Sequence, residues 1–67
     1  MMFHYKIVFE EVSDARALKS LLEEIGDTYA SVNARRAEAI IDSSASITEI
    51  CEVLRDEGYE IIDLELL

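Results

Sequence analysis

The chain has 67 residues, of which 15 are Asp or Glu and 6 are Lys or Arg, so its formal net charge is −9 at pH 7. So short a chain supports one domain with a thin core, which we expect over residues 1–67. The negative charge argues against nucleic-acid binding, because that function needs clustered basic side chains. The single cysteine allows no internal disulfide, so we expect a cytoplasmic protein. The start has no signal-peptide pattern and no apolar stretch approaches the roughly 20 residues that cross a bilayer, so we expect no membrane association.

The first half of the chain predicts a strand followed by a helix. Residues 3–10 place aromatic and β-branched side chains at alternate positions, and this period of two is typical of a half-buried strand. Over residues 14–25 the apolar side chains recur at helical spacing, which indicates an amphipathic helix. Ser13 is the predicted N-cap, Asp14 lies where the helix dipole favours an anion, and Gly26 is the predicted stop.

The second half predicts a hairpin, a second helix and a last strand. Residues 29–42 form the hairpin, with the turn at Asn33-Ala-Arg-Arg36. Ser46-Ile-Thr-Glu49 is a capping box, and the helix that follows it ends at Gly58. Residues 60–67 alternate again, with Ile62, Leu64 and Leu66 predicted on the core face and Ile61, Asp63 and Glu65 on the other.

The order β-α-β-β-α-β is typical of an α+β, ferredoxin-like sandwich, also called a split βαβ fold. We therefore expect a four-stranded antiparallel sheet with two helices on one face. The predicted core comprises Tyr5, Ile7, Phe9, Leu18, Leu22, Ile25, Val32, Ala39, Ile41, Ile47, Ile50, Leu54, Ile62 and Leu64.

Several features at matching distances then carry a resemblance to a known family. They are Val32-Asn33 at the end of the second strand, Ala37–Asp42 in the third, the capping box, the apolar stripe Ile50–Leu54, Gly58-Tyr59 after the helix, and Tyr5-Lys6-Ile7 in the first strand. In these features the chain resembles the heavy-metal-associated domain of copper chaperones and metal-transporting ATPases over nearly its whole length. The resemblance implies the ferredoxin-like fold.

The metal site of that family does not carry over to this sequence. The family holds a soft cation such as Cu(I) with Met-x-Cys-x-x-Cys, between its first strand and first helix, because thiolates select soft ions. Aligned on the apolar positions of the helix, Glu11 and Asp14 stand at the two cysteine positions, and a shift of one residue gives Glu10 and Ser13. We therefore expect no soft-metal binding and no cofactor.

Three other features have two interpretations each. Glu10, Glu11 and Asp14 could form a weak site for Ca(II), Mg(II) or Mn(II), although acids are also common at helix starts because the dipole favours them. Cys51 lies on the apolar side of the second helix and is expected to pack in the core rather than to react. His4, the sole histidine, could pair with an acid or a metal, but with no second partner it is expected to be a surface residue on the outer face of a central strand.

The sequence favours a binding role over catalysis. With one histidine and two glycines, it offers no nucleophile–base–orienter set and no glycine-rich phosphate loop, so we expect no enzyme. Val8, Ile40 and Ile61 are predicted on the sheet face away from the helices, where they form an apolar partner surface if the register brings them together, although single exposed Val and Ile residues are also common. The last strand is expected at a sheet edge, which invites strand addition or a homodimer. The expected function is contact with a protein partner or a second copy, and the alternative is weak cation binding at the acidic loop.

Overall fold

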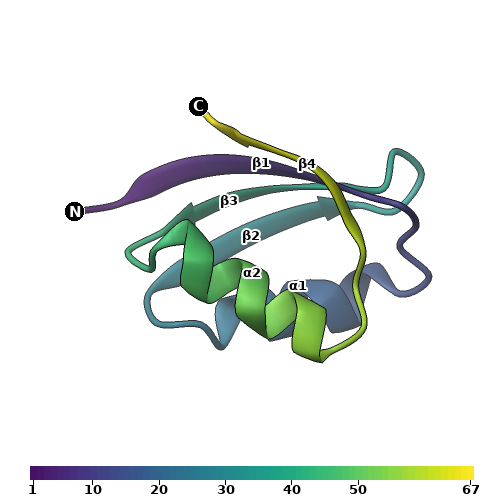
Figure 1. Ribbon diagram of the computed structural model, residues 1–67, viewed down its shortest axis with the longest axis horizontal. Coiled ribbons are helices and arrows are strands. Elements are labelled where there is room, and N and C mark those ends of the chain that lie inside the picture. Colours follow the sequence, from purple (N-terminus) through teal and green to yellow (C-terminus); the bar gives the residue numbers. More distant parts are fainter.

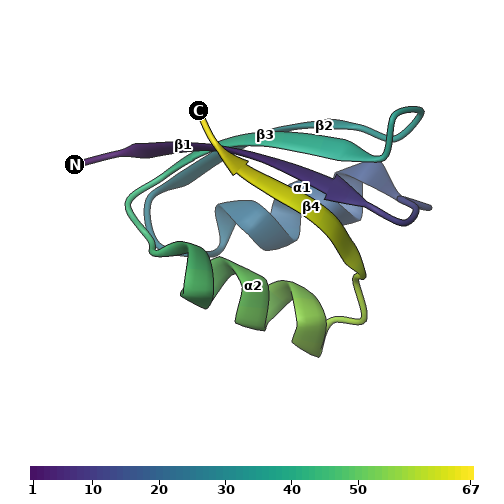
Figure 2. The ribbon, with the colours of Figure 1, turned by 45° about the horizontal axis from the view of Figure 1, so that its top comes forward.

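The computed structural model describes residues 1–67 as four strands and two helices. In chain order these are β1 (Phe3–Phe9), α1 (Ala15–Glu23), β2 (Thr28–Asn33), β3 (Glu38–Ser43), α2 (Ile47–Asp56) and β4 (Ile61–Leu66) (Figure 1). The strands form one antiparallel sheet in the order β2-β3-β1-β4, and both helices lie on the same side of it (Figure 2). The predicted α+β class, with four antiparallel strands and two helices, is confirmed. Neither helix is long and apolar enough to cross a membrane.

The core lies between the sheet and the helices, because each strand turns alternate side chains toward α1 and α2. Most of the predicted core is buried there, while Val32, Ile47 and Leu64 are half-buried against it. Val12, in the loop before α1, is a core residue that the sequence did not predict. The buried apolar residues are Tyr5, Ile7, Phe9, Val12, Leu18, Leu22, Ile25, Ala39, Ile41, Ile50 and Leu54.

A β-bulge changes the faces of β4. Phe9 stands opposite Ile61 and Val8 stands opposite Asp63, so Ile62 is an extra residue in β4. As a result Ile61 packs against the core and Ile62 is 61% exposed. The predictions of Ile62 in the core and of Ile61 on the outer face are therefore wrong, because the bulge interrupts the alternation at this point.

The start of α1 also differs from the prediction by one residue. Asp14, not Ser13, is the N-cap, and its Oδ1 accepts a hydrogen bond from the backbone amide of Ala17 at 3.1 Å. The carboxylate of Asp14, a candidate metal ligand in the sequence, thus accepts a hydrogen bond from a backbone N–H of the first turn that has no partner within the helix.

The ends of α2 follow the predicted signals. Ser46 is the N-cap, and its hydroxyl accepts from the amide of Glu49 at 3.3 Å. At the other end Gly58 has φ +87°, which only glycine adopts without strain. The amides of Gly58 and Tyr59 donate to Arg55 O and Leu54 O, each at 3.0 Å, which is the pattern of a Schellman motif. This ending directs the chain into β4.

The hairpin turn lies one residue later than predicted. Asn33 is the last residue of β2, and its Oδ1 accepts from the amide of Arg36 at 3.2 Å. The residue with left-handed angles is Ala37, at φ 50°. The carbonyl of Ala37 in turn accepts from the amide of Phe9 at 2.7 Å, so the turn is fixed to the centre of the sheet.

Two buried hydroxyl groups stabilise the opposite end of the hairpin. Thr28 Oγ1 donates to the carbonyl oxygen of Ile25 and lies 2.6 Å from Ser43 Oγ. Ser43 Oγ also accepts from the amide of Ala45 at 3.0 Å. The three bonds join the loop after α1, both hairpin strands and the loop before α2, and they leave neither hydroxyl unsatisfied.

Candidate interaction surface

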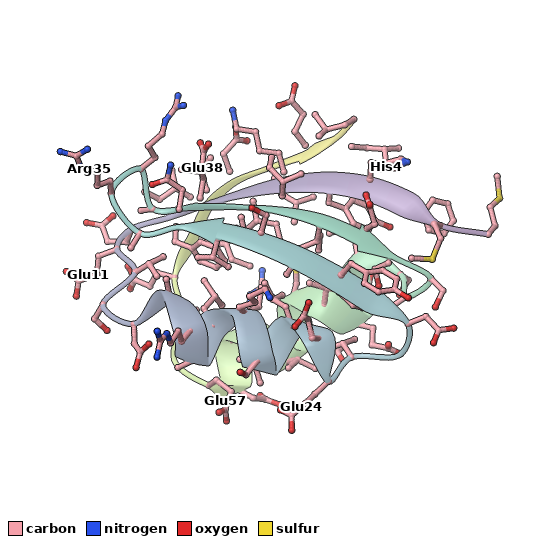
Figure 3. All side chains as sticks on the ribbon, turned by 180° about the vertical axis from the view of Figure 1, so that it is seen from behind. His4, Glu11, Glu24, Arg35, Glu38 and Glu57 are labelled. Atoms are coloured by element: carbon pink, nitrogen blue, oxygen red, sulfur yellow. The ribbon has the colours of Figure 1, made fainter.

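The sheet face opposite the helices, here called the outer face, has no element packed on it (Figure 2). Cross-strand pairing arranges its side chains in three rows. The first row is Asn33, Glu38, Val8 and Asp63; the second is Ser31, Ile40, Lys6 and Glu65; and the third is Tyr29, Asp42 and His4. In Figure 3 the labelled side chains of Glu38 and His4 project from this face at its two ends, whereas Glu24 and Glu57 lie on the helix side.

Three apolar side chains cross the outer face on a diagonal. Val8 and Ile40 occupy adjacent strands one row apart, as do Ile40 and Tyr29, so each pair is within reach of side-chain contact. Tyr29 is 69% exposed and Ile40 is 39% exposed. This apolar diagonal (Val8, Ile40 and Tyr29) includes two of the three residues of the predicted partner surface, and the third, Ile61, lies on the core face.

Sequence reasoning did not assign Tyr29 to this surface. The signal was present, because Tyr29 is out of phase with Val32, which was predicted in the core on the same strand. In the structure Val32 packs against the core and Tyr29 faces outward. A tyrosine in this position adds an aromatic body and a hydroxyl group, a combination that is frequent in protein interfaces.

Charges surround the diagonal unevenly. Glu38 Oε2 lies 3.9 Å from Lys6 Nζ, and Glu38 Oε1 lies 3.8 Å from Arg36 Nε. His4 Nδ1 pairs with Asp42 Oδ1 on the same face. Asp63 and Glu65 on β4 take part in no ion pair.

The centre of the outer face is therefore close to neutral, and its β4 side is acidic. Lys6 stands across from Glu65 in the sheet, but its ammonium group is directed to Glu38 instead. The unpaired carboxylates on β4 are thus free to meet a cationic partner.

An acidic pocket lies at the end of β1 farthest from His4. It has a volume of about 400 Å³ and is lined by Glu10, Glu11, Ser13, Glu57, Gly58, Tyr59 and Glu60. The amide of Glu10 donates to Glu60 O at 3.0 Å, which holds the β1–α1 loop beside the start of β4. Tyr59 is fixed by an edge-to-face contact with Phe9, at 5.7 Å between ring centroids.

The structure brings together only two of the three acidic residues predicted as a cation site, Glu10, Glu11 and Asp14. Glu10 and Glu11 meet Glu57 and Glu60 in the pocket, but Asp14 does not line it. No three His, Cys, Asp or Glu side chains lie close enough together to hold a metal ion. Sequence reasoning missed Glu57 and Glu60, because only the pairing of β4 with β1 brings them to this loop.

The other candidate side chains are separate from both surfaces. Cys51 is half-buried on α2 and forms no disulfide. His4 is exposed near the start of β1, as expected for the outer surface of a central strand.

Comparison with known proteins adds no assignment. No family model, no curated protein and no solved structure matches the chain.

Proposed function

We propose that this chain is a small non-catalytic domain that acts through contact with a protein partner or with its own copy. The observation that carries the proposal is the open outer face, on which the apolar diagonal of Val8, Ile40 and Tyr29 is bordered by charged side chains. An apolar centre with a polar rim is the usual composition of an interface. The pocket of this structure lies at the β1–α1 loop and the start of β4, and none opens on the outer face.

We also propose that the domain has the ferredoxin-like fold and is related to the heavy-metal-associated family. The strand order supports the fold, because β3 lies between β1 and β2, and β1 lies between β3 and β4. Each helix thus connects two strands that are separated by a third, which is the feature that defines a split βαβ unit. The family relation rests on the features of the sequence described above.

The absence of catalysis in this proposal is supported by the separation of the polar groups. The only imidazole pairs with Asp42 at one end of β1, and the acidic pocket lies at the other end, beside Glu10. Neither place combines a base with a nucleophile held in hydrogen-bonding reach. The loss of a thiolate site is supported by the position of the single cysteine, Cys51, on α2 rather than at the start of α1.

The alternative of cation binding at Glu10, Glu11 and Asp14 has no observation in its favour. The carboxylate of Asp14 caps α1, and the other two lie among carboxylates without forming a metal-binding group. We therefore do not propose it as a second function.

Sedimentation equilibrium over a concentration series reaching the millimolar range tests self-association. We expect a reversible increase in mass, accompanied by concentration-dependent NMR shifts of the amides of Tyr29, Ile40 and Val8. Ile40→Lys should weaken the association, and Ile62→Lys, the same change at an exposed isoleucine off the apolar diagonal, should not. A protein that stays monomeric with unchanged spectra would contradict self-association through this face.

A further inference from the structure

The two edges of the sheet are not equally accessible. At the β2 edge, Glu23 of α1 reaches across, and its Oε2 accepts from the amide of Ala30 at 3.4 Å. At the β4 edge no element lies beyond the strand, as Figure 2 shows. A strand that adds to the sheet therefore meets a side chain in its way at β2 and none at β4.

The backbone of β4 has free hydrogen-bonding groups along this edge. The amide of Leu67 donates to His4 O at 2.8 Å, so the amide of Leu67 faces β1. Because the direction alternates along an antiparallel strand, the backbone groups of Leu64 and Leu66 point away from β1. They are the donors and acceptors that an additional strand would use.

The β4 edge also exposes apolar side chains. Leu66 is 65% exposed, and Ile62 and Leu67 are exposed as well. Natural edge strands are commonly blocked by charged side chains, above all lysine, by proline or by a bulge, and the charges on β4 are the acids Asp63 and Glu65. Here the bulge at Ile62 affects only the start of the strand, and no lysine or proline follows it.

The charges on β4 argue against a second copy as the occupant. In a symmetric dimer, β4 would pair antiparallel with β4 of the second copy. The outer-face side chains of one strand would then stand opposite those of the other, so Asp63 and Glu65 would face acidic side chains. With Leu64 on the axis, for example, Asp63 would face Glu65 of the other copy, and the contact would occur twice. Like charges directly opposite each other destabilise a sheet.

We propose that the β4 edge binds an extended segment of a partner protein as a fifth strand, and that this segment alternates basic and apolar residues. Its Lys or Arg side chains would stand across from Asp63 and Glu65 on the outer face, and its apolar side chains would stand across from Leu64 and Leu66. The carboxylates of the acidic pocket at the start of β4 add to the negative potential of Asp63 and Glu65, and this potential attracts a cationic segment. The inference rests on the proposed role in protein contacts and identifies the edge and the partner chemistry.

A titration with two synthetic peptides tests this inference. One peptide alternates Lys with Val over eight residues, and the other alternates Glu with Val. We expect the Lys/Val peptide to bind about tenfold more tightly. It should shift the amides of Leu64 and Leu66 and slow their hydrogen exchange, and it should leave the amide of Ala30 unchanged. Equal affinity for the two peptides, or no binding of either, would overturn the inference.

Three variants separate the contributions of charge and backbone. Asp63→Lys combined with Glu65→Lys should reverse the preference between the peptides. Glu24→Lys combined with Glu52→Lys makes the same change in net charge at two exposed positions, the C-cap of α1 and the surface of α2, and should keep the preference. Leu66→Pro removes an outward-facing amide donor and should weaken both peptides. Reversal by the helix variant would show a long-range charge effect and would refute binding at the edge.

The same titration distinguishes this inference from the proposed function. Peptide shifts confined to Tyr29, Ile40 and Val8 would overturn strand addition at β4 and would leave the outer face as the contact surface. Shifts at Leu64 and Leu66 in a protein that is monomeric at all concentrations would contradict self-association and support the edge.

Discussion

Replacing Leu22 by alanine tests the packing of α1 on the sheet. Leu22 is 0% exposed and lies on the buried stripe of α1 with Leu18. The change removes three carbon groups, each worth about 0.8 kcal/mol when buried, or about 2.4 kcal/mol in all. The cavity that remains raises the expected loss to about 2.7–5 kcal/mol. Since so small a core rarely supplies more than about 3–5 kcal/mol, most of the stability should be lost.

Urea unfolding followed by far-UV circular dichroism measures this loss. The matched control is Leu66→Ala, the same substitution at a side chain that is 65% exposed, and its free energy of unfolding should change by about 0.5 kcal/mol or less. A Leu22→Ala protein with an unchanged midpoint, or a control that loses as much stability, would refute the burial of this stripe.

Urea unfolding also tests three other substitutions, for each of which the structure predicts whether the free energy of unfolding rises or falls. Gly58→Ala should lower the free energy of unfolding by about 1 kcal/mol, because φ is +87° and the added Cβ meets no atom within 4 Å, so the cost is the backbone conformation alone. Ala37→Gly should raise it by about 0.5 kcal/mol, because the left-handed angles at φ 50° suit glycine; a loss of stability there would contradict the turn geometry. Ser46→Ala should lower it by about 1 kcal/mol through loss of the N-cap, whereas Ser31→Ala, at an exposed serine of β2, should stay within about 0.5 kcal/mol.

The class of the fold could be predicted because local patterns and tertiary structure agree in most of this chain. The alternation in β1 places Tyr5, Ile7 and Phe9 on the core face, and the structure buries all three. The capping serine and Gly58 mark the ends of α2 because each satisfies a local backbone requirement. Patterns of this kind depend only on neighbouring residues.

The predictions from sequence are wrong where two neighbouring residues suit the same structural position equally well. Ser13 and Asp14 are both good N-caps, and only the hydrogen bond to the third residue of the helix decides between them. Ile61 and Ile62 are both apolar, so the sequence cannot show which of them faces the core once a bulge intervenes.

The candidate surfaces were predictable to the extent that they lie on a single strand or a single loop. Val8 and Ile40 followed from alternation along their own strands. The acidic pocket did not follow, because Glu10 and Glu60 meet only through pairing between the two ends of the chain.

The pairing of β1 with β4 also has a kinetic consequence. It joins Tyr5 to Leu66, so it closes a loop that contains most of the sequence. Contacts of such high sequence separation slow folding, because the loop entropy is lost before they form. Until β4 docks, β1 is itself an edge strand, and its backbone is open to other molecules. If β4 docks after the rest of the sheet has formed, the rate of that step, rather than the final stability, should govern how much protein aggregates during refolding.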